Sequence, residues 1–373
     1  MDDSVPVLIP SGRVFTPDEL IFYADRDGRT LDEAIADADL LVSCPHSGAA
    51  IPEELAAFLA PQFTHRLQYD FSDVSTSAIV RRWAELDPRV VYVENPHPRI
   101  VRDPNRARPD DLGAKLREAV ARVRAAGPYQ RVDLTGVDAI RPVTFSFFPL
   151  LVIPDEGEEL DRMVAMFEEV AERGLGVYER TRDELRERFV AAKFAASRAD
   201  GRPRRFTTLS FHDTMNHTTT RDGAVRVERD PKDRLPAIVA LSNRGDHDGE
   251  PRDVDPPDPV TMRPDLVREL AAAHRLGFAA GSADDVQLNQ PYLGSQEIIA
   301  SGARFRELAG DADAAGVTLS AVQAEFLREF LLGERNAAVL ARPGTGWVEP
   351  DPDHVDRIAR ACMASWDVFR ESA

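Results

Sequence analysis

Residues 39–48 read DLLVSCPHSG, an almost continuous apolar run that ends in a proline, His46, a serine and Gly48. Such a run is typical of a strand covered on both faces, as in the parallel sheets of α/β proteins. The polar residues that follow it would then lie beyond the carboxyl end of the strand, where such sheets bind their ligands. This segment therefore predicts both a fold class and one part of a site.

Four other segments have the same form, each an apolar run followed by polar residues at its carboxyl end. They are 89–94 (RVVYVE), 206–211 (FTTLSF), 237–241 (AIVAL) and 285–289 (DVQLN). Segments with helical spacing of apolar residues alternate with them, at 73–86, 110–125, 157–197 (with a break near Gly174–Gly176), 264–276 and 352–371. This alternation predicts an α/β fold with a mostly parallel central sheet flanked by helices.

The size and composition of the chain are those of a globular protein. It has 373 residues, of which 43% are apolar and 29% charged, and we find no internal repeat. We expect a single domain over residues 1–373, with insertions near 127–205 and 218–263. Two stretches within them, 127–156 and 218–235 with 245–263, are expected to be surface loops or lids, with linkers as the alternative; the second is rich in Asp, Arg and Pro.

The net charge of −18 argues against nucleic acids and anionic membranes as partners, because an acidic surface repels both. A small anionic substrate remains compatible, since a few arginines in a cleft can dominate the local field. Two cysteines, Cys44 and Cys362, exclude a disulfide framework and fit a reducing compartment. With neither a signal-peptide pattern nor an apolar run near membrane-spanning length, we expect a cytoplasmic protein. The sequence gives no oligomeric state.

Two histidines, His46 and His212, follow the first and third of the predicted strand runs. Neutral imidazole is the commonest transition-metal ligand, and a catalytic zinc needs three protein ligands with one position left for water. Asp73, at the start of a predicted helix, is the candidate for the third ligand. Each residue alone has a structural alternative: a hydrogen-bonded histidine in a turn or in the core, or an aspartate that caps the helix.

Residues 99–106 read RIVRDPNR and follow another predicted strand. Arginines at this position can bind a carboxylate through bidentate hydrogen bonds, although an exposed charged loop is the simpler interpretation. Asn289, in the segment NQPYLG, could hydrogen-bond a ligand or only shape a turn. Glu325 could take a proton from an attacking water, or be an ordinary glutamate on an amphipathic segment.

Six blocks of this sequence, in the same order, resemble the N-formylglutamate amidohydrolase family, over roughly residues 39–330. They are 41–48 (LVSCPHSG) with 51–53 (IPE), Ser72-Asp73, 99–106 (RIVRDPNR), 209–215 (LSFHDTM), 289–294 (NQPYLG) and 323–328 (QAEFLR). The resemblance implies a fold similar to the zinc-exopeptidase and phosphorylase-like α/β architecture. It also implies hydrolysis of a linear amide in a small anionic N-formyl or N-acyl amino acid, such as N-formylglutamate, in amino-acid metabolism.

The resemblance assigns a role to each candidate residue. His46, Asp73 and His212 become ligands of Zn²⁺ or another divalent metal, and Glu325 becomes the general base. Arg99, Asn105 and Arg106 become binders of the substrate's carboxylates, and Asn289 is a further substrate-binding candidate.

The chain also departs from the family pattern. Ser210 stands where an aspartate usually precedes the histidine, which weakens an expected carboxylate–histidine contact. Ser77 stands where a second aspartate often follows Asp73, and Gly294-Ser295 replaces a pair of glycines. Glu297, beside that turn, is an additional acidic residue for which we expect at most a minor role.

Three other classes of function remain open from the sequence. The chain could be a family relative that acts on a different amide or peptide. It could be a non-catalytic binding protein that keeps the fold without the metal. The long helical stretch at 157–197 leaves a structural or scaffolding protein as the third class.

Overall fold

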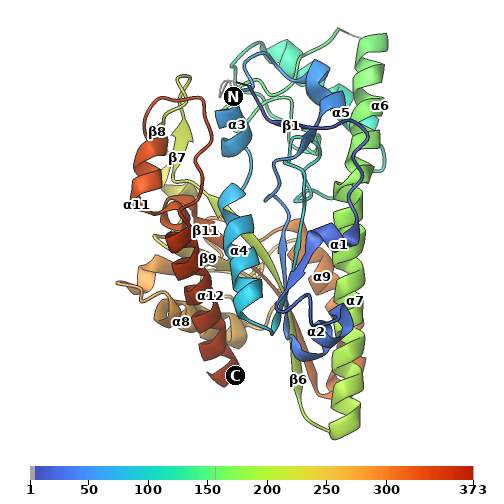
Figure 1. Ribbon diagram of the computed structural model, residues 1–373, viewed down its shortest axis with the longest axis vertical. Coiled ribbons are helices and arrows are strands. Elements are labelled where there is room, and N and C mark those ends of the chain that lie inside the picture. Colours follow the sequence, from blue (N-terminus) through green and yellow to red (C-terminus); the bar gives the residue numbers. More distant parts are fainter. Residues whose placement is uncertain (1–4, 156, 373) are drawn as a thin grey trace.

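The computed structural model describes residues 5–155 and 157–372. A seven-stranded sheet with the strand order β10-β9-β11-β6-β3-β5-β2 forms its centre (Figure 1). These strands are β2 (Ile21–Tyr23), β3 (Leu40–Cys44), β5 (Val90–Glu94), β6 (Arg204–Thr214), β9 (Val239–Ser242), β10 (Val286–Leu288) and β11 (Val317–Leu327). Two small pairs lie outside the sheet: β1 (Leu8–Ile9) with β4 (Ile51–Pro52), and β7 (His217–Thr219) with β8 (Val225–Glu228).

The sheet is mostly parallel, as predicted. The pairs β10–β9, β11–β6, β6–β3 and β3–β5 are parallel, whereas β9–β11 and β5–β2 are antiparallel. β9 and β10 run against β11, so the polar residues that follow them do not leave the sheet in the same direction as those after β3, β5 and β6. Ser242, at the end of β9, pairs with Gln323 well before the end of β11.

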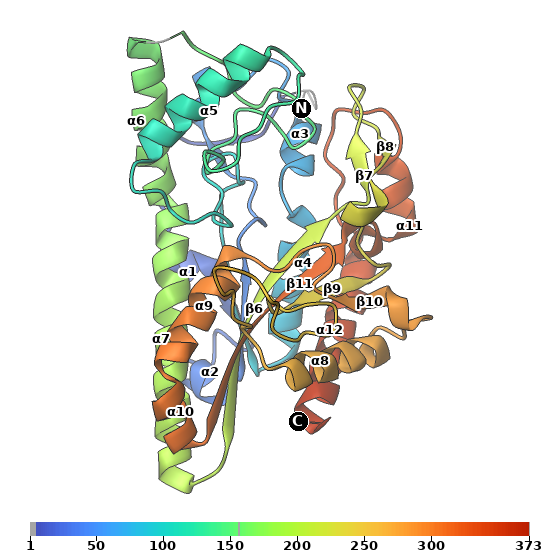
Figure 2. The same cartoon turned by 180° about the vertical axis from the view of Figure 1, so that it is seen from behind.

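Helices cover both faces of the sheet. One face carries α4 (Val74–Leu86), α8 (Pro264–Gly277) and α12 (Pro352–Ser372), of which α4 and α12 lie in front of the sheet in Figure 1. The other carries α2 (Leu31–Asp37), α7 (Leu175–Asp200), α9 (Gln296–Glu307) and α10 (Ala309–Ala315), as Figure 2 shows for the last three. Because side chains alternate along a strand, Leu40 and Val42 pack with the first set and Leu41 with the second.

The helical stretch predicted at 157–197 is two helices, α6 (Glu158–Arg173) and α7, which follow one another along the long axis of the molecule (Figures 1 and 2). They meet at Gly174, where a Cβ atom would lie 2.2 Å from the ring of His97. Phe189 of α7 stacks on Phe206 of β6 at 4.7 Å. This part of the predicted insertion near 127–205 therefore covers a face of the central sheet.

Apart from the apolar side chains on the two faces of the sheet, a separate apolar cluster extends beyond the carboxyl ends of β3 and β5. It joins α6 to the 3₁₀ helix Glu53–Phe58, to α3 (His65–Asp70) and to α5 (Leu112–Ala126). Ile140, Leu150 and Leu151 are buried in this cluster, so the stretch 127–156 packs into the protein at these points. The remaining helices are α1 (Pro17–Leu20) and α11 (Arg328–Leu340). Among the helices that the structure describes, none combines the length and the apolarity needed to cross a membrane.

Candidate active site

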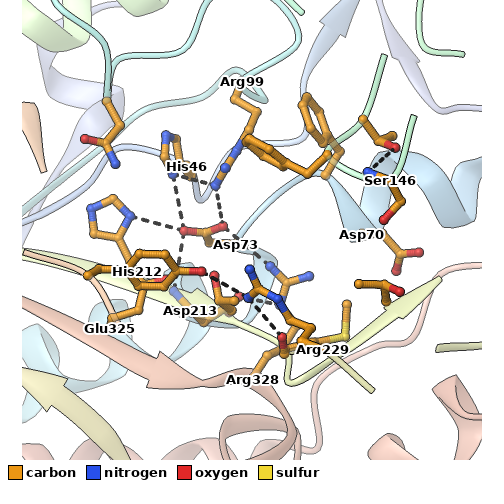
Figure 3. Close-up of a pocket in the computed structure, with 18 of the residues that line it drawn as sticks. His46, Asp70, Asp73, Arg99, Ser146, His212, Asp213, Arg229, Glu325 and Arg328 are labelled. Carbon is orange, nitrogen blue, oxygen red and sulfur yellow. Dashed lines mark hydrogen bonds and ion pairs between the residues drawn. The ribbon is translucent and has the colours of Figure 1, made fainter. Parts of the chain in front are cut away.

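A cavity of about 580 Å³ opens beyond the carboxyl ends of β3 and β6 (Figure 3). His46 follows β3, His212 lies near the end of β6, and Asp73 immediately precedes α4. All three side chains line the cavity and are 2% exposed. The amide of Asp73 donates a hydrogen bond to the carbonyl oxygen of His46 (2.8 Å), which holds two of these three segments together.

The two imidazoles converge on the carboxylate of Asp73. Nδ1 of His46 lies 3.4 Å and Nδ1 of His212 lies 3.3 Å from Oδ2 of Asp73, and one ligand atom from each residue lies within 4.8 Å of the others. Ligands bound at about 2.0–2.1 Å in tetrahedral geometry are about 3.3 Å apart, so this donor set fits a metal such as zinc. Although Asp73 occupies the N-cap position of α4, its side chain makes no capping hydrogen bond, which leaves the carboxylate to the cluster.

The outer ring nitrogen of each histidine has its own partner. Nε2 of His46 lies 2.7 Å from Oδ1 of Asp103, and Nε2 of His212 lies 2.9 Å from Oγ of Ser210. Partners of this kind fix the orientation of metal-binding histidines and keep the inner nitrogen available. Asp103 lies in the arginine-rich block at 99–106, but sequence analysis assigned no role to it.

Arg99 brings a positive charge into the cluster. Its Nη2 donates to Nδ1 of His46 (2.6 Å) and to Oδ1 of Asp73 (2.9 Å). Since a guanidinium can only donate, Nδ1 of His46 carries a lone pair that faces the cluster. Burial raises the pKa of Asp73, but Arg99 and His46 outweigh it and hold that pKa well below its usual range. Burial and Arg99 lower the pKa of His46, and Asp103 and Asp73 more than offset them, so the net pKa is raised.

Glu325 lies beside His212, because the two residues are paired in the register of β11 and β6. Its side chain lines the cavity, is 6% exposed and accepts a hydrogen bond from Nε2 of Gln323 (2.8 Å). Burial raises the pKa of Glu325; His212 opposes this shift and Asp73 adds to it. A carboxylate with a raised pKa is a better proton acceptor near neutral pH.

Three of the four predicted substrate-binding residues line the cavity, namely Arg99, Asn105 and Arg106. Nε of Arg106 donates to Asp138 (2.7 Å), and the amide of Gln296 donates to Oδ1 of Asn105 (2.7 Å). The loop-like parts of both predicted insertions also contribute to the wall, through Phe145 and Thr218 among others.

Asn289 does not line this cavity. Its side chain accepts a hydrogen bond from the amide of Asn243 (2.9 Å) and donates to Oδ1 of Asn243 (2.9 Å) and to the carbonyl oxygen of Asp246 (2.6 Å). These bonds fix the turns after β9 and β10, which corresponds to the structural alternative for this residue.

Sequence reasoning did not single out several charged residues of the site. Nη2 of Arg328 lies 3.5 Å from Oδ1 of Asp73, and Arg328 also donates to the carboxylate of Asp213 and to the carbonyl oxygen of Ser72 (2.6 Å). Burial raises the pKa of Asp213 to about 7; Arg328 opposes the shift and Asp73 adds to it. Asp213 stands one position from His212, and Arg328 stands three positions from Glu325, within the sequence blocks that contain those neighbours. This proximity was the available signal in the sequence.

Nη1 of Arg229 donates to the hydroxyl oxygen of Tyr292 (3.0 Å), and the amide of Arg244 donates to the carbonyl oxygen of Leu293 (3.0 Å); all four residues line the cavity. Tyr292 belongs to the loop after β10, so this loop reaches the cavity although β10 runs against β11. Arg229 and Arg244 come from the segment predicted as an insertion, which gave no sequence signal for a site.

A His–Asp–His cluster beside a buried glutamate, in a cavity at the strand ends of an α/β fold, is a donor set that metal-dependent hydrolases use. The profile of the N-formylglutamate amidohydrolase family matches residues 38–328, and the chain belongs to this family. A search of curated protein sequences gave no match for this chain.

The crystal structure of an N-formylglutamate amidohydrolase from Ralstonia eutropha JMP134 has a similar fold. The TM-score is 0.53 and the sequence identity 19%, over 94% of this chain and 96% of that chain. At this identity the likeness shows the α/β fold alone.

Proposed function

We propose that this protein is a metal-dependent amidohydrolase that cleaves the amide bond of an N-formyl or N-acyl amino acid such as N-formylglutamate. Family membership supports the hydrolase class and the kind of substrate. The observation that carries the metal dependence is the convergence of His46, Asp73 and His212 beside Glu325 in one buried cluster. These residues span most of the chain, which supports a single working domain over residues 1–373.

His46, Asp73 and His212 would hold the metal through two Nδ1 atoms and one carboxylate. A divalent ion such as Zn²⁺ would supply Lewis acidity there, which polarises the amide carbonyl and makes water more acidic. Two imidazoles and one carboxylate form a known ligand set of catalytic zinc, with a position left for water or substrate.

Glu325 handles the proton in this proposal. Its carboxylate accepts a proton from the attacking water and then passes it to the leaving amine, so that the products are the free amino acid and a carboxylic acid. Gln323, which donates to Glu325, holds the carboxylate in place. The raised pKa of Glu325 makes it easier for the carboxylate to accept the proton from water, and still allows the carboxyl group to donate that proton to the leaving amine.

Arg99, Asn105 and Arg106 orient the substrate. The two guanidiniums can bind the carboxylates of the amino-acid portion, and the Asn105 amide lies between them in the sequence and lines the same cavity. Fixing the amino acid in this way places its amide next to His46, Asp73 and His212. A fixed orientation of the amide lowers the activation barrier for hydrolysis.

The test is hydrolysis of a panel of N-formyl and N-acetyl amino acids, N-formylglutamate included. The panel is measured with the purified protein, after removal of metal by a chelator, and after zinc is restored. We expect activity on at least one N-formyl substrate, loss of activity on chelation, and recovery with zinc. Full activity in the metal-free protein would contradict the metal dependence. No activity on any member with zinc bound would contradict this substrate class.

A further inference from the structure

Glu297 is a buried carboxylate on the face of the sheet that α7 and α9 cover, close to the cluster of His46, Asp73 and His212. It is 4% exposed and stands in the first turn of α9. Four described side chains donate to it: Ser43 (2.6 Å), Ser210 (3.0 Å), Tyr178 (2.6 Å) and Arg182 (2.7 Å). So many donors around one carboxylate fix its position closely.

The strand register brings this carboxylate within reach of the cluster. Ser43 of β3 and Ser210 of β6 are directly paired, and both hydroxyls point to the same Oε2 atom of Glu297. His212 lies two residues beyond Ser210 on β6, so its side chain stands on the same face. Oγ of Ser210 therefore lies between two groups, 3.0 Å from Glu297 and 2.9 Å from Nε2 of His212.

The direction of these hydrogen bonds follows from the number of protons available. An ionised carboxylate can only accept, and a serine hydroxyl has one proton to donate. Burial raises the pKa of Glu297, but Arg182 and the hydroxyl donors outweigh it and lower the pKa to about 2, so the group is ionised at neutral pH. Ser210 therefore donates to Glu297, and its oxygen accepts from the Nε2–H of His212.

This proton arrangement leaves the lone pair of His212 on Nδ1, the atom that faces Asp73 at 3.3 Å. Arg99 leaves the lone pair of His46 on Nδ1 in the same way. Two imidazole lone pairs and one carboxylate thus face one another, an arrangement that a cation between them stabilises.

We propose that Glu297, acting through Ser210, is a positioning residue that fixes the tautomer and the orientation of His212 for metal binding. Asp103 acts on His46 directly, at 2.7 Å, whereas Glu297 acts on His212 through one intervening hydroxyl. The part of this inference that concerns metal binding rests on the proposed function; the tautomer of His212 does not.

The experiment combines two measurements on the full chain. Long-range ¹H–¹⁵N spectra of protein labelled with ¹⁵N-histidine, with His212→Gln used for assignment, report the tautomer of His212 in the metal-free state. Competition with a chromogenic chelator gives the affinity for Zn²⁺. The variants are Ser210→Ala, Glu297→Gln and their combination. Tyr178→Phe is the matched control, because it removes a donor to Glu297 and leaves the Ser210 contact.

We expect wild-type His212 to carry its proton on Nε2. Ser210→Ala and Glu297→Gln should each lose this preference and bind Zn²⁺ about 10–100-fold more weakly. The combined variant should be no weaker than Ser210→Ala alone, and Tyr178→Phe should resemble the wild type.

A proton on Nδ1 of wild-type His212 would overturn the inference, and this measurement requires no variant that might fail to fold. Wild-type tautomer and wild-type zinc affinity in Glu297→Gln would overturn it too. A wild-type protein that binds no zinc would contradict the proposed function instead, and the tautomer would still decide the role of Glu297.

Discussion

Nδ1 of His212 lies 3.3 Å from Oδ2 of Asp73, although 139 positions separate the two residues in the chain. The register of β6 sets the position of the histidine, and the start of α4 sets that of the aspartate. Both groups are buried, so their positions follow from how β6 and the start of α4 pack.

Replacing Glu325 by Gln should lower kcat by at least about 100-fold, because the amide cannot take the proton of the attacking water. Zinc content should remain at the wild-type level, since Glu325 lies beside the ligand cluster and is not one of its three proposed members. Steady-state kinetics and metal analysis of the same preparation check both statements. Glu329→Gln is the control: Glu329 itself does not line the cavity, although its partner His217 does, and its loss should change kcat far less than the loss of Glu325. Normal turnover in Glu325→Gln would remove this residue from the mechanism.

Replacing Arg106 by Ala should raise KM about 10-fold or more for substrates with a free carboxylate, with a smaller change in kcat, because a binding contact is lost. Arg108→Ala is the control, since Arg108 pairs with Glu172 outside this cavity. The measurement is kcat and KM for an N-formyl amino acid and for its amide-capped counterpart. Equal KM values in the two variants would show that Arg106 does not bind the substrate.

Replacing Asn289 by Ala should reduce stability and leave KM unchanged. The substitution removes three hydrogen bonds to Asn243 and Asp246, two of them buried, and alanine also tolerates the backbone φ of +55° at this position poorly. We expect a loss of about 1–3 kcal/mol in the free energy of unfolding, measured with urea. A raised KM with unchanged stability would instead restore the substrate-binding role that the sequence suggested.

Asp70, in the cavity wall, should make stability depend on pH. Burial raises its pKa from 3.8 to about 6, against the opposing effect of Thr219. Because the pKa of Asp70 is raised in the folded state, protonation of this carboxyl favours folding. This stabilisation of the folded state is complete below about pH 4 and is lost as the pH rises through 6. Between pH 4.5 and 7.5 the metal-free wild type should therefore lose about 1–2 kcal/mol relative to Asp70→Asn, measured with urea. Parallel pH profiles for the two proteins would contradict this.

Most of the fold was predictable because buried strands and amphipathic helices have strong periodic patterns. The runs at 39–44 and 206–211 became β3 and β6, and the helix at 73–86 became α4. The central strand β11 was missed, because Gln323 and Glu325 interrupt its apolar pattern and made it resemble an amphipathic segment. Those polar residues are present because the strand borders the cavity.

Strand direction could not be predicted from the sequence. An apolar run carries no mark of its orientation within a sheet, so the sequence does not show that β9 and β10 run opposite to β3. Asn289, directly after β10, lies outside the cavity lining. Tyr292, three residues further on, still reaches the cavity because its loop turns back toward it.

Within the site, the proximity of His46, Asp73 and His212 followed from the ends of predicted elements and from the family resemblance. The partners of their outer nitrogens did not follow. Ser210 was taken as a weakened contact, since the sequence cannot show that Glu297, 87 positions away, lies behind it. Such contacts depend on how α9 packs on the sheet, and no local pattern encodes that packing.

The most direct test of the metal site is diffraction from zinc-treated crystals, recorded on both sides of the zinc absorption edge. We predict one anomalous peak within about 2.0–2.2 Å of Nδ1 of His46, Nδ1 of His212 and a carboxylate oxygen of Asp73. An empty cluster at saturating zinc, or zinc bound only by other residues, would contradict metal binding by His46, Asp73 and His212.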